Sequence, residues 1–162
     1  MTENVQIKAV VVTVSDSRDE ETDLSGAVLA DLLTGIGAEI IEKKIVSDDY
    51  ENLRETLSKF AERADVNTII TTGGTGLAER DNTPEATLAV IEREVPGIGE
   101  AMRLQTVEKT PTAVLSRGVC GVVNQTLIIN LPGSPKGVEE CFAVIKPVLQ
   151  HAVNQINGKT KH

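Results

Sequence analysis

Apolar residues along this chain form short β-branched runs that alternate with stripes at helical spacing. The first run, residues 7–15, is almost uninterrupted, which is typical of a central strand buried on both faces. Residues 38–46 show more alternation between apolar and polar positions, which favours a place nearer a sheet edge. Further strands are expected at about 66–71, and as a pair at about 118–123 and 126–131 that is joined by Asn124-Gln125.

The helical stripes lie between these strands. The clearest follows Ser47-Asp48-Asp49 and places Leu53, Leu57, Phe60 and Ala64 at the i, i+4, i+7 and i+11 positions. Other helices are expected over about 24–36 with Asp23 or Ser25 as the cap, from Thr83 or Pro84 to about Glu94, over about 99–107, and from Pro135 to about Asn157 with an interruption at Pro147. This order predicts an α/β fold, a three-layer α/β/α sandwich with a mostly parallel central sheet.

Length and composition refine this picture without changing it. A chain of 162 residues is long enough to build its own core, and we expect a single domain over residues 1–157 with a flexible tail at 158–162. Hydrophobic residues make up 40% of the chain but aromatic residues only 2%. The core must therefore consist mainly of Val, Ile, Leu and Ala, which suits a buried parallel sheet.

The charge balance narrows the classes of partner. With 16 basic and 24 acidic residues, the formal net charge is −8. Such a surface repels a nucleic-acid backbone and anionic lipid, so we expect neither a nucleic acid nor a membrane as a partner. The first residues lack a positively charged leader, and their apolar run is too short to span a bilayer, which indicates a cytoplasmic protein.

Cysteine and histidine chemistry is not favoured by the sequence. Cys120 and Cys141 stand in apolar surroundings without a CxxC spacing, so we interpret them as buried free thiols. His162 is the last residue, and His151 belongs to the last predicted helix, far from the strand ends. A Ser-His-Asp or Cys-His hydrolase therefore lacks a plausible base.

A glycine-rich stretch, TTGGTGLAERDNTPEA at 71–86, follows the third predicted strand. Ligands of an open parallel sheet bind beyond the carboxyl ends of its strands, where this stretch and NLPGSPKG at 130–137 are expected. Gly73, Gly74 and Gly76 allow close approach of an anion to backbone N–H groups, and Thr75 adds a hydroxyl group. A tight strand-to-helix turn explains the same glycines without any ligand.

Two aspartates, which follow two different predicted strands, are expected on either side of these glycines. Asp81 precedes Thr83-Pro84, and Asp48 precedes the second helix, so helix capping is one role open to each of them. Their convergence beside a phosphate-binding loop suggests the alternative, because Mg²⁺ takes oxygen ligands and bridges phosphates. Phosphoryl or nucleotidyl transfer is then the leading class of reaction.

Other polar residues near the predicted strand ends have both a ligand-binding and a structural interpretation. Four basic side chains could pair with substrate phosphates or remain solvated, namely Arg18, Arg80, Arg117 and Lys136. Ser15, Asp16 and Ser17 could bind a polar heterocycle or form a turn.

Taken together and in this order, the motifs resemble the MogA/MoaB family of molybdenum cofactor biosynthesis, over about Ile7 to Val148. The stretches that carry the resemblance are TVSDSR with DLSG, VSDD, TTGGTGLAERDNTPEATL, GIGEAMR, LSRGVCGV and LIINLPGSPKGVEE. The DEETDLSG segment is more similar to the MoaB branch than to the MogA branch.

The resemblance implies a molybdopterin adenylyltransferase, which uses Mg²⁺ and ATP to attach AMP to molybdopterin and releases pyrophosphate. By position, Asp48 and Asp81 match the family's metal-linked catalytic carboxylates, although Ser47 replaces a common proline and leaves Asp49 as an alternative to Asp48. Residues 73–76 (Gly73, Gly74, Thr75 and Gly76) match the nucleotide loop, while Ser15, Asp16, Pro132, Gly133 and Ser134 match the pterin side.

The resemblance also implies a homo-trimer or homo-hexamer and a molybdenum-insertion protein as a further partner. Two other functions stay open. The chain could be a non-catalytic molybdopterin-binding or carrier protein, or the related domain of molybdenum-insertion proteins and CinA-like nucleotide hydrolases, which usually carry additional domains.

Overall fold

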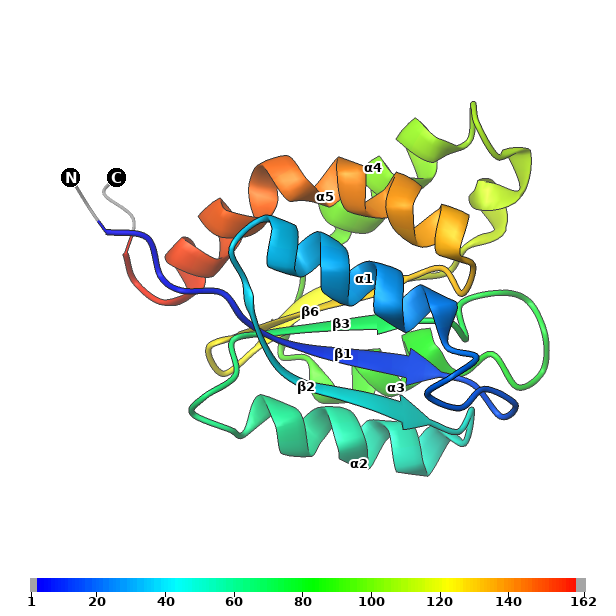
Figure 1. Cartoon of the computed structure of the whole chain (residues 1–162), viewed down its shortest axis with the longest axis horizontal. Coiled ribbons are helices and arrows are strands. Elements are labelled where there is room, and N and C mark those ends of the chain that lie inside the picture. Colours follow the sequence, from blue (N-terminus) through cyan, green and yellow to red (C-terminus); the bar gives the residue numbers. More distant parts are fainter. Residues whose placement is uncertain (1–2, 160–162) are drawn as a thin grey trace.

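A six-stranded sheet forms the middle layer of the molecule, in the strand order β2-β1-β3-β6-β5-β4 (Figure 1). The structure is a computed structural model that describes residues 3–159. The strands are β1 (Lys8–Val14), β2 (Glu39–Val46), β3 (Thr68–Thr72), β4 (Arg93–Glu94), β5 (Cys120–Val123) and β6 (Thr126–Leu131). The first four strands of the spatial order are parallel, and β5 runs antiparallel to both of its neighbours, β6 and β4. The expected mostly parallel sheet is confirmed, with β2 at one edge.

Helices cover both faces of the sheet. One face carries α1 (Leu24–Gly35), α4 (Pro96–Thr106) and α5 (Pro135–Ile156), and the other carries α2 (Tyr50–Ala61) and α3 (Thr83–Val90) (Figure 1). Alternate residues of β1 serve the two cores, because Ala9 and Val11 pack with α1 and α5 while Val10 and Val12 pack toward α2. The α/β/α sandwich is therefore as predicted.

Two boundaries differ from the expectation. The second helix ends at Ala61, and Ala64 is exposed beyond it rather than part of its buried stripe. The third helix ends at Val90 instead of near Glu94, because Ile91 is extended and the next residues pair with β5. Gly121 makes this pairing possible, since a Cβ there would lie 2.7 Å from the carbonyl oxygen of Arg93.

The α4 region also departs from the prediction. The helix begins at Pro96, so the Pro-Gly-Ile-Gly sequence expected as a loop forms its first turn. Proline suits the first helical position, but the two glycines have a low helix propensity and therefore favoured the prediction of a loop. A short 3₁₀ helix, η1 (Pro111–Leu115), follows and was not predicted.

The last helix continues through Pro147, where an interruption was expected. Pro147 cannot donate a hydrogen bond to the carbonyl of Ala143. Both residues lie on the exposed face of the helix, so water can satisfy that carbonyl. The predicted tail begins at Gly158, but the Lys159 amide still donates to the carbonyl of Asn154. Residues 160–162 lie outside the described residues.

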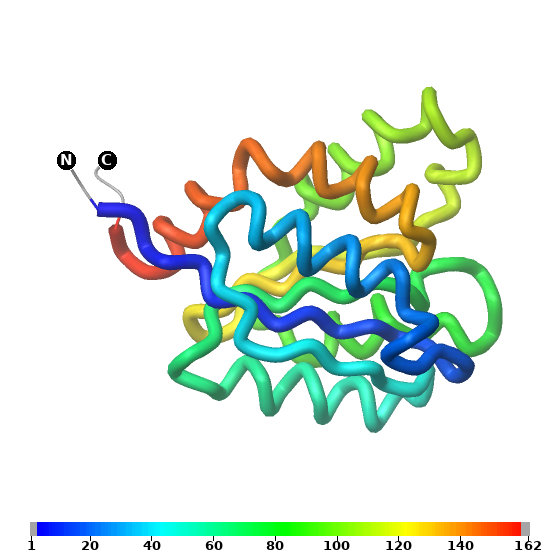
Figure 2. The backbone as a smooth tube through the Cα atoms, viewed as in Figure 1, coloured from blue at the N-terminus to red at the C-terminus, as the bar shows by residue number. Residues whose placement is uncertain are grey.

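The carboxyl ends of the parallel strands gather at one end of the molecule. The backbone trace shows the first and last described segments at the opposite end (Figure 2). The two thiols, Cys120 and Cys141, are free and buried as expected. Burial raises the pKa of Cys120 to about 12 and that of Cys141 to about 11, which keeps both protonated at neutral pH. Among the described helices, none combines the length and apolar character needed to cross a membrane.

Asp23 joins β1 to α1. Its carboxylate accepts from the Thr13 hydroxyl at 2.6 Å and from the Gly26 amide at 2.9 Å, and the residue is buried. Asp23→Ala would remove the cap and leave Thr13 without its partner, so we expect unfolding free energy to fall by about 1–3 kcal/mol in urea titrations. Asp31→Ala, on the exposed side of the same helix, is the control. Equal stability of the two variants would contradict this role.

Candidate active site

The end of β1, the turn after β3 and the start of α3 come into backbone contact at the carboxyl ends of the strands. Gly73 and Gly74 follow β3 with φ values of +101° and +69°. A Cβ on Gly73 would lie 2.5 Å from the carbonyl oxygen of Val14 at the end of β1, so no other residue fits there. The Thr83 hydroxyl and amide donate to the carbonyls of Gly73 and Gly74 at 2.9 and 3.1 Å. The glycines thus form a tight turn and also bring the start of α3 to the strand ends.

A second loop, residues 132–134 after β6, packs directly against this turn. The Thr72 hydroxyl donates to the carbonyl of Pro132 at 2.6 Å, and a Cβ on Gly133 would lie 3.3 Å from the Cα of Gly73. Ser25 and Arg18 donate to the Gly133 carbonyl at 2.6 and 3.1 Å. Arg18 therefore has a structural role in supporting this loop.

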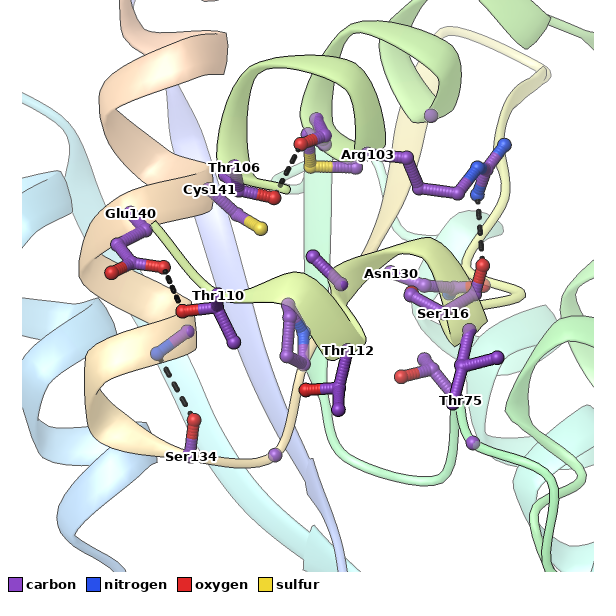
Figure 3. A pocket seen from close by; sticks show the side chains of 18 of the residues that line it. Thr75, Arg103, Thr106, Thr110, Thr112, Ser116, Asn130, Ser134, Glu140 and Cys141 are labelled. Carbon is purple, nitrogen blue, oxygen red and sulfur yellow. Dashed lines mark hydrogen bonds between the residues drawn. The ribbon is translucent and has the colours of Figure 1, made fainter. Parts of the chain in front are cut away.

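These loops border a cavity of about 610 Å³. Of the predicted site residues, seven contribute to its lining, namely Gly74, Thr75, Gly76, Asp81, Pro132, Gly133 and Ser134. Figure 3 shows Thr75, Ser116 and Asn130 on one side and Ser134 and Glu140 on the other. Gly73, Ser15, Asp16 and Asp48 are not part of the lining.

The wall of the cavity that sequence reasoning missed comes from α4 and η1. It includes Met102, Arg103, Thr106, Thr110, Thr112, Leu115 and Ser116, and α5 adds Glu140 and Cys141. The Thr110 hydroxyl donates to Glu140 at 3.1 Å across the cavity edge (Figure 3). The helix expected over about 99–107 and the GIGEAMR and LSRGVCGV motifs touch this wall, but residues 107–114 have no regular apolar spacing from which η1 could be predicted.

Asp81 does not cap a helix. Asn82 is the N-cap of α3, and its side chain makes no capping bond. One carboxylate oxygen of Asp81 instead accepts from the Ala78 amide at 3.0 Å. A Cβ on Gly76 would lie 2.8 Å from that oxygen, so the third glycine admits the carboxylate against the loop. Of the two roles open to Asp81, capping is excluded.

Asp48 is likewise free of a capping role, because Asp49 caps α2 by accepting from the Asn52 amide at 2.9 Å. The Asp48 backbone is fixed on both sides, since its amide donates to Asp16 at 3.0 Å and its carbonyl accepts from Asn82 at 3.1 Å. Partial burial and the negative charges of Asp16 and Asp81 raise the pKa of Asp48. Asp48 is thus electrostatically coupled to Asp81 although it lies outside the cavity lining.

The remaining predicted ligand-binding groups have internal partners. Arg80 donates to Asp16 at 2.8 Å and lowers the pKa of that carboxyl group, although the pair is exposed. The Ser15 hydroxyl oxygen accepts from the amides of Ser17 and Arg18 at 3.2 Å, so it forms the turn that was one of its two interpretations. Lys136 lines the cavity and lies 3.8 Å from Glu140.

Across residues 3–159, no group of three or more His, Cys, Asp or Glu side chains is placed to hold a metal ion. Mg²⁺ needs fewer protein ligands, because it keeps several waters and takes one or two carboxylates together with substrate phosphates. Asp48 and Asp81, whose negative charges interact, are the two carboxylates that could serve as such ligands.

Comparison with known proteins identifies the family. A family model described as a probable molybdopterin binding domain matches residues 10–151. The chain belongs to this molybdopterin-binding family. A molybdopterin adenylyltransferase from Helicobacter pylori strain J99 is 39% identical over 152 residues, which cover 91% of this chain and 86% of that protein.

Two further relatives agree with the family. The crystal structure of the molybdopterin biosynthesis enzyme MoaB from Thermus thermophilus has a TM-score of 0.87 and 43% identity, covering 95% of this chain and 98% of that one. The molybdenum cofactor synthesis protein cinnamon from Drosophila melanogaster is 43% identical over 150 residues, which cover 90% of this chain but only 25% of that protein. The resemblance to MogA and MoaB proteins is confirmed.

The charge at Asp48 predicts a pH-dependent stability. Because its folded-state pKa is raised, the wild type loses stability relative to Asp48→Asn as pH rises through that pKa. In Mg²⁺-free buffer we expect Asp48→Asn to have the higher Tm at pH 7, and the difference to vanish near pH 3, where both forms are neutral. A lower Tm of the variant at pH 7 in thermal unfolding would contradict the cost assigned to burying this charge beside Asp16 and Asp81.

Proposed function

We propose that the protein is a molybdopterin adenylyltransferase of molybdenum cofactor biosynthesis. In this reaction the terminal phosphate oxygen of molybdopterin attacks the α-phosphorus of ATP. The bond to the β-phosphate breaks, and pyrophosphate leaves with the electron pair. The observation that carries the proposal is the convergence of Asp81, the glycine turn and the 132–134 loop on one cavity in a chain of this family.

The glycine turn and its neighbours would bind phosphate. Gly74, Thr75 and Gly76 offer backbone N–H groups and a hydroxyl, and α3 directs its positive end toward the same place. Gly73 would act through the shape of the turn, because its own amide donates to the carbonyl of Leu131 at 3.1 Å. Pro132, Gly133 and Ser134 line the cavity, and we assign them to the pterin side together with Ser15 and Asp16. For the last two residues, the ligand must extend past the cavity lining toward β1.

Asp48 and Asp81 would hold Mg²⁺ as the catalytic carboxylates. When bound, the ion would neutralise the charge on the reacting phosphates, which is the main requirement of such a transfer. The chain itself fixes both residues, through the Ala78 amide at Asp81 and the Asp16 and Asn82 contacts of the Asp48 backbone, although the charge of Asp81 repels that of Asp48. A cation between them would offset that repulsion.

The proposed reaction also suggests where the protein acts, how it assembles and which protein receives its product. We place it in the cytoplasm, assembled as a homo-trimer or homo-hexamer, and passing its product to a molybdenum-insertion protein. The competing function is a non-catalytic molybdopterin-binding or carrier protein, which would use the same cavity and form no AMP adduct.

A single-turnover assay separates the two functions. Purified protein is mixed with molybdopterin, ATP and Mg²⁺, and adenylylated pterin is followed by chromatography. We expect product from the wild type and a rate loss of at least about 100-fold for Asp81→Asn and for Asp48→Asn, because each removes a metal-linked charge. Asp49→Asn is the matched control, since asparagine also caps a helix and should retain near wild-type turnover.

The outcome decides between catalysis and binding. Tight molybdopterin binding by the wild type without any product would establish the carrier function. If Asp49→Asn lost turnover and Asp48→Asn kept it, the assignment of Asp48 would move to its neighbour.

A further inference from the structure

Arg117 connects both ends of the segment that carries Asp81. We call residues 76–81 the Asp81 loop. The Arg117 guanidinium donates to the carbonyl of Gly76 at 2.8 Å through Nε and to the carbonyl of Asp81 at 2.7 Å through Nη2. Its own amide donates to the carbonyl of Thr75 at 2.9 Å, and Nη1 contacts the carboxylate of Glu85 on α3.

This arrangement depends on the shape of the guanidinium group. Its planar fork presents several N–H donors at fixed directions, so one side chain can fix two carbonyls at once. Lysine carries the same charge on a single ammonium group and cannot reproduce that geometry. The first and last residues of the Asp81 loop are therefore held at a set separation by one residue from outside the loop.

Few other contacts restrain this loop. Within it, Asp81 accepts from the Ala78 amide, and the Asp81 amide donates back to the carbonyl of Ala78 at 3.0 Å. Residues 77–80 are exposed, and the side chain of Arg80 pairs with the exposed Asp16, while its carbonyl accepts from Asn82 at 3.3 Å. The two carbonyl contacts of Arg117 fix the backbone at both ends of the loop, and the Ala78 amide then directs the Asp81 carboxylate.

Arg117 is itself anchored to the cavity wall. The Nη1 atom of Arg103, on α4, donates to the carbonyls of Ser116 at 3.3 Å and Gly118 at 2.9 Å, one on each side of Arg117. Arg103 also lines the cavity. A continuous set of hydrogen bonds therefore joins the cavity wall at α4 to the Asp81 loop.

We propose that Arg117 is a positioning residue that sets the Asp81 carboxylate for catalysis by holding the carbonyls of Gly76 and Asp81. This inference rests on the proposed adenylyl transfer for its catalytic part. It assigns Arg117 a role different from a direct phosphate ligand, because three of its guanidinium contacts are made within the protein.

Three variants test the role. Arg117→Lys keeps the charge, Arg117→Ala removes the side chain, and Glu85→Gln removes the negative charge beside Nη1 but leaves both carbonyl contacts. Each is measured for single-turnover rate, for molybdopterin Kd by pterin fluorescence, for ATP dependence, and for amide hydrogen exchange of residues 76–83 without ligand. Far-UV circular dichroism and Tm report whether each variant is folded.

We expect Arg117→Lys and Arg117→Ala to lose about 100-fold in turnover rate, because a displaced catalytic group is that costly. The molybdopterin Kd should change by much less than the rate. Exchange at Ala78 should accelerate about tenfold as the loop opens more often. Glu85→Gln should resemble the wild type in both rate and exchange.

Several results would overturn the inference. Wild-type turnover in folded Arg117→Lys would show that charge alone suffices, and a rise confined to the ATP concentration needed for half-maximal rate would make Arg117 a phosphate ligand. Unchanged exchange at Ala78 would show that the loop is held without Arg117. If Arg117→Ala does not fold, Arg117→Lys decides. Absence of product from the wild type would overturn the proposed function alone, since the exchange measurement still reports on the loop.

Discussion

Close contact between backbone segments at the carboxyl ends of β1, β3 and β6 underlies the whole site. Gly73 lies against the carbonyl of Val14, and Gly133 lies against the Cα of Gly73, at distances that leave no room for a Cβ without displacement. Because these segments touch without side chains between them, the starts of α3 and α5 reach the same point as the strand ends. The cavity and the Asp81 loop are consequences of that packing. The Thr72 and Thr83 hydroxyls stabilise it by donating to the carbonyls of Pro132 and Gly73.

The two candidate carboxylates acquire their character from their neighbours. Asp49 and Asn82 occupy the N-cap positions of α2 and α3, so Asp48 and Asp81 are left with side chains that the helices do not use. Partial burial and mutual repulsion then make Asp48 a carboxylate that a cation would stabilise. If these carboxylates only stabilised the fold, each would be expected to have a cationic partner of its own, as Asp16 has in Arg80.

Periodicity and turn chemistry were sufficient for the sandwich, the strand order along the chain and the glycine turn, because burial on two faces leaves an unambiguous apolar pattern. They failed where a long-range contact decides local structure. Ile91 to Glu94 leaves the helix because β5 offers a partner strand, and Pro147 stays in its helix because Ala143 faces water. Asp48 and Asp49 differ in burial and in which of them caps α2, and neither composition nor spacing reveals that difference. The α4 helix was expected, but η1 lacked any periodic signal, and nothing in the sequence showed that the two would form a wall of the cavity.

That wall comes from a different part of the chain than the groups at the strand ends. The groups nearest the proposed chemistry come from the turns after separate strands of the sheet, where every change disturbs several elements at once. The facing wall comes from one uninterrupted stretch, residues 96–118, at the side of the sheet that ends in the short strand β4. Exchanges of side chains such as Met102, Thr112 or Leu115 would reshape the cavity without altering the turns that follow the strands. The shape of the cavity and the geometry of the strand-end groups are therefore determined by separate segments of the chain, which are joined through Arg103 and Arg117.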